Sequence, residues 1–212
     1  MPLGPGGSNG LSPSAAGNNE EDGMRSYRVG YFVGSLSSTS INRVLSRALI
    51  RLAPPDVQLT EVPIGDLPLY SPDFDQDYPP QARALKEAIA ASDAVLFVTP
   101  EYNRSIPGAL KNAIDWASRP WGQNSFDHVP AAVIGASPGQ IGTAMAQQSL
   151  RAVLSFCNAR QMTAPEAYVY FKPGHFTDDG EVTDESTTTF LTDFMQEFRD
   201  HVERVLTVLP RG

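Results

Sequence analysis

The sequence has little of what secreted or membrane-spanning proteins need. Cys157 is the only cysteine among the 212 residues, which excludes an intrachain disulfide and fits a reducing compartment. No stretch approaches the roughly 18 consecutive apolar residues of a membrane helix, and the N-terminus lacks the charged and apolar segments of a secretory signal. We therefore expect a soluble protein of the cytoplasm.

Histidine and positive charge are also scarce. The three histidines, His128, His175 and His201, are too scattered to match the spacing of a metal site. The 16 Lys and Arg residues are outnumbered by 24 Asp and Glu residues, which gives a net charge of -8, and they form no basic stripe. Such a chain lacks the charge that neutralises a nucleic-acid backbone, so neither a metal nor nucleic acid is expected.

Residues 1–24 differ in composition from the rest of the chain. They are rich in Gly, Pro, Ser and Asn and contain few apolar side chains. Because such a segment cannot bury enough surface to offset the entropy lost on ordering, we predict a disordered tail. The remaining residues, 25–212, are enough for one domain that buries a core without disulfides or metals.

Apolar runs and helical patterns alternate five times along this domain. Strands are predicted at residues 27–34, 57–62, 93–99, 131–136 and 167–171. Helices are predicted at residues 41–52, 79–92, 108–118, 142–159 and 190–209, where apolar side chains recur with helical spacing.

The first, third and fourth runs are almost entirely apolar, as in a parallel sheet that is covered on both faces. Right-handed crossovers then favour a doubly wound, five-stranded parallel sheet of order 2-1-3-4-5 between two helical layers, an α/β fold. In such a sheet, ligands bind beyond the carboxyl ends of the strands. Three unusual loops lie at that edge.

The first loop, residues 34–42, reads GSLSSTSIN. Its five hydroxyl side chains and the N–H groups that begin the next helix suit an anion, because the positive end of the helix dipole lies there. Phosphate is the natural guest, although a Ser-rich turn that ends in a helix cap accounts for the same residues. A nucleoside triphosphate is disfavoured, because the loop has neither a GxxxxGK[ST] pattern nor a lysine.

The second loop, residues 99–108, reads TPEYNRSIPG and follows the third strand. Two prolines stiffen it, and Gly108 lets the backbone come close to a ligand. The N–H groups from Glu101 to Asn103 could bond the edge of a heterocycle on which Tyr102 stacks. The alternative is an ordinary turn, in which Tyr102 packs and Glu101 is a solvated charge.

The third loop, residues 135–142, reads GASPGQIG, and Ser137 within it fits the GxSxG pattern of a hydrolase nucleophile elbow. His175 or His201 follows in the chain order of a hydrolase triad. That elbow uses the N–H of the residue after serine, however, and Pro138 has none. The glycines also resemble a dinucleotide fingerprint, but they follow the fourth strand instead of the first. A Gly-rich wall beside a flat ring is the better explanation.

Taken together, the three loops predict a ligand with one phosphate and one flat, hydrogen-bonding ring. Each loop alone is a weak signal, but all three fall at the same edge of the predicted sheet. FMN has both parts of such a ligand.

Three segments, GSLSSTSIN, VTPEYNRSIPGALKNAIDWASRP and GASPGQIGTA, resemble the NADPH-dependent FMN reductase family. This flavodoxin-like group includes bacterial quinone, azo-dye and chromate reductases, and the resemblance runs from about residue 27 to residue 204. It implies a flavodoxin-like fold, a noncovalently bound FMN, and NADPH or NADH as the electron donor.

The resemblance also implies which residues hold the cofactor, and it names no catalytic side chain. The implied FMN-binding residues are Ser35, Ser37, Ser40, Ile41 and Asn42 around the phosphate, Pro100, Glu101, Tyr102 and Asn103 along the ring, and Ser137, Pro138 and Gly139 on its other side. Many relatives carry arginine where this chain has Ser37, so one counter-charge for the phosphate is missing. Arg104 changes the pocket mouth, where relatives often have an aromatic or small residue.

The implied reaction is a ping-pong transfer of hydride from NAD(P)H, through FMN, to quinone, azo, metal-oxyanion or free flavin acceptors. Family members associate so that a neighbouring subunit covers the FMN edge, which implies a homodimer or homotetramer. Residues 110–121, with Trp121, are candidates for that contact, and Trp116 suits either the contact or the core. Two other classes stay open, a nonenzymatic one-electron carrier of the flavodoxin type and a serine hydrolase at Ser137.

Overall fold

The protein is described by a computed structural model that covers residues 26–211. The predicted tail, residues 1–24, lies outside the described residues. The strands are β1 Tyr27–Val33, β2 Val57–Glu61, β3 Ala94–Val98, β4 Pro130–Ser137, β5 Arg160–Gln161 and β6 Ala167–Tyr170. The helices are α1 Ile41–Leu52, α2 Pro80–Ala90, α3 Gly108–Ala117, α4 Ala144–Phe156 and α5 Glu185–Val208, with a short 3-10 helix, η1, at Pro72–Phe74.

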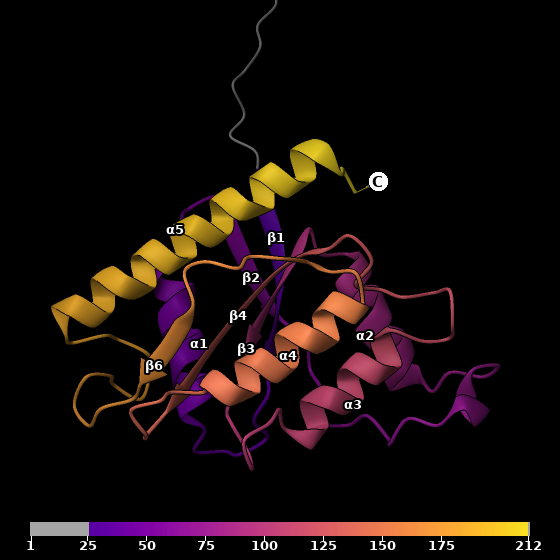
Figure 1. Cartoon of the computed structure of the whole chain (residues 1–212), viewed down its shortest axis with the longest axis horizontal. Coiled ribbons are helices and arrows are strands. Elements are labelled where there is room, and N and C mark those ends of the chain that lie inside the picture. Colours follow the sequence, from indigo (N-terminus) through magenta and orange to yellow (C-terminus); the bar gives the residue numbers. More distant parts are fainter. Residues whose placement is uncertain (1–25, 212) are drawn as a thin grey trace, which may run out of the picture.

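All strand pairs are parallel, and the sheet has the order β2-β1-β3-β4-β5, with β6 also paired to β4. Helices α1 and α5 cover one face of the sheet, and α2, α3 and α4 cover the other (Figure 1). The predicted order 2-1-3-4-5 and the flavodoxin-like, three-layer architecture are therefore confirmed.

The fifth strand differs from the prediction, because it is split in two. β5 pairs with Pro130 and Ala131 at the start of β4, and β6 pairs with Ile134 to Ser137 at its end. The segment between them contains Pro165, which has no N–H to donate to a ladder. The sheet thus has six strands in five positions.

The two faces of the sheet bury separate apolar clusters, one on each side. Trp116 is fully buried in the cluster of α2, α3 and α4, where its Nε1 donates to the carbonyl of Pro68 at 2.7 Å. Tyr70 and Tyr78 both meet its ring edge-on, with ring centroids 5.1 Å apart. The structure therefore assigns Trp116 to the core, whereas Trp121 is 78% exposed.

The register of the central strands brings the three predicted loops together. Val33 of β1 lies beside Val98 of β3, and Val98 lies beside Ile134 of β4. Two hydrogen bonds continue the ladder beyond the strands, from Gly34 N to Val98 O and from Thr99 N to Ile134 O, both at 2.9 Å. The loops that follow β1, β3 and β4 therefore leave the sheet side by side.

Candidate flavin site

The three loops enclose a depression of about 240 Å³ at the carboxyl edge of the sheet. It is lined by Ser35, Ser37, Thr39, Ser40, Ile41, Asn42, Pro100, Glu101, Tyr102, Ala136, Ser137 and Pro138. The structure thus brings the predicted cofactor-binding residues together, except Asn103 and Gly139, which lie outside the lining. Thr39 and Ala136 join them.

The first loop places hydrogen-bond donors at the start of α1. Ser40 is the N-cap of this helix, and its Oγ accepts from the N–H of Arg43 at 3.3 Å. Within the described residues, the N–H groups of Ile41 and Asn42 donate to no acceptor. Both belong to the first turn, where the helix dipole favours an anion, so they are free to bind a phosphate.

The side chain of Asn42 is bonded within the protein. Its Nδ2 donates to the carbonyl of Ala136, and its Oδ1 accepts from the N–H of Ala136, both at 2.9 Å. Asn42 is almost fully buried, so this pair fixes the start of α1 to the end of β4. Only its backbone N–H remains available to a phosphate.

The second loop contains a tight two-residue turn. Tyr102 and Ser105 form an antiparallel bridge, and their backbone N–H and C=O groups pair at 3.1 and 3.0 Å. Asn103 and Arg104 between them both have positive φ, 51° and 63°, a conformation that asparagine tolerates and that is costly for arginine. The Tyr102 hydroxyl lies 3.3 Å from Ser35 Oγ, so the turn is tied to the first loop.

The carboxylate of Glu101 is not a solvated charge. Its Oε2 accepts from the N–H groups of Met145 and Ala146 at 3.0 and 3.2 Å, in the first turn of α4. Its Oε1 lies 3.4 Å from a guanidinium nitrogen of Arg104. Only 11% of the side chain is exposed, so Glu101 caps α4 from another loop.

We expect the Glu101→Ala variant to lose about 1 to 3 kcal/mol of unfolding free energy, because two N–H groups at the start of α4 lose their acceptor. Urea denaturation measures this loss. Glu166→Ala is the matched control, since Glu166 is exposed and its carboxylate accepts only from side chains, Gln148 Nε2 at 3.1 Å among them. A loss no larger than that of the control would show that Glu101 does not cap the helix.

Ser137 lacks the partners of a hydrolase nucleophile. Its Oγ accepts from the N–H of Gly139 at 3.0 Å. His201 is bound to the carbonyl of Arg160, at the opposite end of the sheet, and burial lowers the pKa of its imidazole. His175 Nδ1 faces Asp184 at 3.6 Å. Neither imidazole reaches Ser137, so the described residues form no triad.

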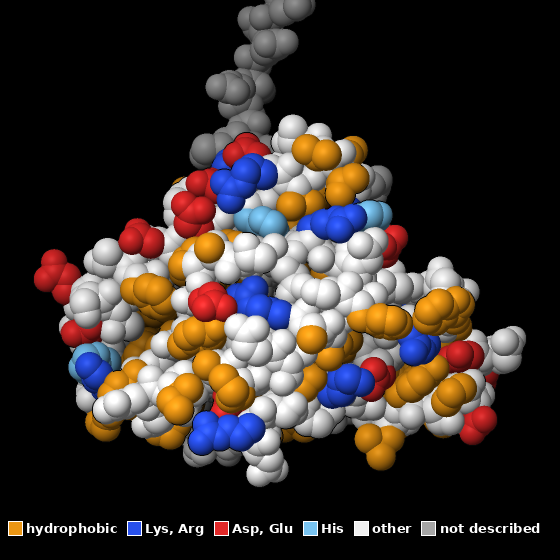
Figure 2. Space-filling view, in the orientation of Figure 1, with side chains coloured by type: hydrophobic (Ala, Val, Ile, Leu, Met, Phe, Trp, Pro, Cys, Tyr) orange, Lys and Arg blue, Asp and Glu red, His pale blue; other side chains and the backbone are white. Residues whose placement is uncertain are grey.

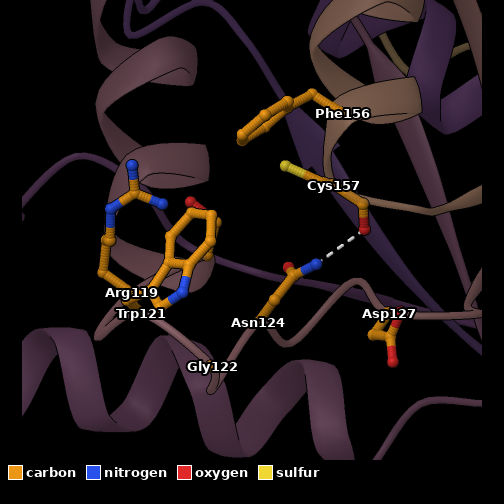
Figure 3. Close-up of a pocket in the computed structure, with 8 residues that line it drawn as sticks. Arg119, Trp121, Gly122, Asn124, Asp127, Phe156 and Cys157 are labelled. Atoms are coloured by element: carbon orange, nitrogen blue, oxygen red, sulfur yellow. Dashed lines mark hydrogen bonds between the residues drawn. The ribbon is translucent and has the colours of Figure 1, made fainter.

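A larger hollow of about 370 Å³ lies far from the three loops, near the C-terminal ends of α3 and α4 (Figure 3). Trp121 and Phe156 form its walls, and the thiol of Cys157 points into it. Asn124 Nδ2 donates to the carbonyl of Cys157 at 2.6 Å. Burial raises the pKa of the Cys157 thiol, so this cysteine is a poor nucleophile.

A family model described as NADPH-dependent FMN reductase matches residues 27–174, most of the described chain. The chain belongs to this family. The match covers all three loops around the depression, which confirms the resemblance that the motifs indicate.

Two similar proteins are named for quinone reduction, and this chain can be compared with both. It is 47% identical over 171 residues to a 2-hydroxy-1,4-benzoquinone reductase of Burkholderia sp, which covers 81% of this chain and 93% of the relative. It is also 47% identical over 178 residues to a quinone reductase of Pseudomonas putida, with coverage of 84% and 95%. A solved structure, the flavoenzyme NAD(P)H:(acceptor) oxidoreductase FerB from Paracoccus denitrificans, superposes with a TM-score of 0.81 at 47% identity and covers 84% of this chain and 98% of FerB.

This chain is therefore an NAD(P)H-dependent oxidoreductase of the quinone reductase type, and its cofactors are FMN and NAD(P)H. The prediction of an enzyme is confirmed, against the alternatives of an electron carrier and a serine hydrolase. The donor set in the depression fits the phosphate of FMN, because free N–H groups and hydroxyls converge there.

No helix within residues 26–211 combines the length and apolar composition of a membrane span. In the same part of the chain, no group of three His, Cys, Asp or Glu side chains lies close enough to hold a metal ion.

Proposed function

We propose that FMN lies across the depression, with its phosphate at the start of α1 and its ring along residues 100–103. The observation that supports this placement is the pair of free N–H groups at Ile41 and Asn42, which face the same hollow as the Ser35 and Ser40 side chains. They offer charge-assisted hydrogen bonds to a dianion, and this helix end compensates for the absence of an arginine at Ser37.

In this arrangement the protein binds and orients, and the cofactor carries the redox chemistry. Bound FMN supplies hydride acceptance from NAD(P)H and two-electron donation to an acceptor. Tyr102 is 49% exposed at the rim and forms one wall for the ring. The N–H groups of Glu101 and Asn103, which donate to no acceptor in the described residues, face the edge of the ring. No side chain acts as a general acid or base.

We infer that NAD(P)H and the acceptor occupy the same open side of the ring in turn. Acceptors are quinones, as for the two named relatives, and also azo compounds, metal oxyanions and free flavin. Steady-state rates with NADPH and 1,4-benzoquinone should then give parallel double-reciprocal lines. Intersecting lines would mean that both substrates bind together, and a protein that reduces quinone no faster than free FMN does would contradict the proposal itself.

The proposed assembly is a homodimer or homotetramer that covers the flavin edge. The face that carries α3 and α4 exposes hydrophobic side chains among scattered charges (Figure 2). Trp121 and Phe156 are 78% and 73% exposed on this side of the fold, so both are candidates for the contact between subunits. Light scattering of the purified protein would measure the mass. Location in the cytoplasm stays a prediction.

A further inference from the structure

Charged side chains are rare on the three loops around the site. The only charged residues in segments 34–42, 99–108 and 135–142 are Glu101 and Arg104. Arg43 is the first arginine of α1 after the first loop, and its Nη1 donates to both carboxylate oxygens of Glu61, at 3.0 and 2.9 Å. Glu101 and Arg104 are therefore the two charges that these loops themselves contribute to the site.

In this pair, the negative charge of Glu101 is mostly buried and the positive charge of Arg104 is exposed. Glu101 is mostly buried, and its Oε2 accepts two N–H groups of α4, whose positive end offsets its charge. Arg104 is 70% exposed, and its contact with Glu101 Oε1 is long, at 3.4 Å. Exposed pairs of this kind are weak, so the guanidinium is available to a ligand.

The backbone holds Arg104 in a fixed place. It has a φ of 63°, a conformation that glycine would adopt without strain, and it follows Asn103 with a φ of 51°. Two backbone hydrogen bonds between Tyr102 and Ser105 close the turn, and the Tyr102 hydroxyl ties it to Ser35. A strained arginine at the rim of a site is an outlier that calls for a functional explanation.

We propose that Arg104 is a specificity-determining residue that makes the enzyme prefer planar anionic acceptors, in particular quinones with an ionised ring hydroxyl. This inference rests on the proposed function, because it needs the flavin ring along residues 100–103. Arg104 follows this stretch directly and contacts Glu101, which lines the depression, so in the proposed arrangement its exposed guanidinium is beside the ring.

The chemistry of the two groups matches. A hydroxyquinone ionised at neutral pH presents an anionic oxygen next to a carbonyl oxygen. A guanidinium offers two parallel N–H groups on one edge, and this fork binds a pair of oxygens better than a lysine ammonium does. The chain as a whole carries a net charge of -8, so a local cation is needed to draw an anion to this mouth.

The test compares wild type and Arg104→Gln, both loaded with FMN, at saturating NADPH. The acceptors are 2-hydroxy-1,4-naphthoquinone, an anion at pH 7, and neutral 1,4-naphthoquinone. We expect the ratio of kcat/KM for the anion to that for the neutral quinone to fall about tenfold in Arg104→Gln, equivalent to about 1.4 kcal/mol. Arg104→Lys should retain part of the preference, and 0.5 M salt should reduce the preference of the wild type.

Binding provides a readout that does not depend on turnover. Titration calorimetry with 4-hydroxycoumarin, an anion that is not reduced, should give about tenfold weaker binding to Arg104→Gln than to wild type. Neutral coumarin should bind both proteins equally. Arg204→Gln is the matched control. Arg204 is 62% exposed near the C-terminal end of α5, and its removal changes the net charge equally.

The outcomes separate this inference from the proposed function. If the wild type reduces neither quinone with NADPH, the proposed function itself fails. If both quinones are reduced and Arg104→Gln leaves the ratio unchanged, the function stands and the role of Arg104 is wrong. The role is also wrong if Arg104→Gln leaves the kcat/KM ratio of the two quinones unchanged and raises KM for NADPH but not for NADH. The cation would then bind the 2′-phosphate of the nucleotide.

Discussion

Replacing Gly135 by alanine is expected to lower the free energy of unfolding by about 3 kcal/mol or more, because the added methyl group has no space. An ideal Cβ at Gly135 would lie 2.1 Å from the carbonyl oxygen of Thr99 and 2.2 Å from Thr143 Oγ1. Both contacts are far inside van der Waals distance. One of them is backbone, which cannot rotate away as a long side chain can.

The neighbours of Gly135 have little freedom to move. Thr99 donates its N–H to the carbonyl of Ile134 at 2.9 Å, so it is part of the ladder between β3 and β4. Thr143 is fully buried, and its Oγ1 accepts from Gln147 Nε2 at 3.0 Å. Relief of the clash would therefore separate the loop after β3 from the loop after β4. We expect the variant to bind FMN weakly as well as to unfold easily.

Gly139→Ala is the control for this prediction, since it adds the same methyl group to the same loop. An ideal Cβ at Gly139 would meet only Ser137 Oγ, at 3.5 Å, an ordinary contact. Its expected effect on stability is within about 0.5 kcal/mol. Urea denaturation of the two variants and wild type measures the difference. Equal stability of both variants would mean that β3 and β4 are not packed as closely as the structure has them.

Much of the sheet could be predicted from the sequence, because its signals are local. The apolar runs at β1, β3 and β4 are buried on both faces, as their composition indicates. Parallel strands with right-handed crossovers then leave few possible orders. The split of the fifth strand was not predicted, because an apolar run at β6 hides the two-residue pairing of β5.

The site could be predicted only as far as residue types and loop positions. The partner of Asn42 is the peptide group of Ala136, 94 positions away, and the partners of Glu101 are peptide groups in α4. Backbone atoms carry no sequence signal, so these hydrogen bonds could not be inferred from composition or spacing. The same reason explains why Ala136 was missed as a lining residue. Trp116 was ambiguous because a tryptophan suits both a core and an interface, and its bond to Pro68 decides for the core.

Replacing Ile41 by proline is expected to weaken FMN binding about 10-fold to 100-fold while leaving the fold intact. Proline removes the N–H of the first residue of α1, which donates to nothing within the described residues. It suits this position, since its φ matches the helix and Ser40 before it has the extended conformation that proline requires, with φ -66° and ψ 119°. The lost hydrogen bond to a phosphate dianion is worth about 1.5 to 3 kcal/mol.

Ile41→Ala is the matched control, because Ile41 is partly buried against the cluster of α1 and α5 and both variants lose that packing. The two variants should unfold within about 1 kcal/mol of each other. Quenching of flavin fluorescence gives the dissociation constants for FMN and for riboflavin, which lacks the phosphate. We expect a large difference between the variants for FMN and none for riboflavin. Equal FMN affinity of the two variants would place the phosphate elsewhere. If Ile41→Pro lost as much affinity for riboflavin as for FMN, proline would be disturbing the ring site and not the phosphate contact.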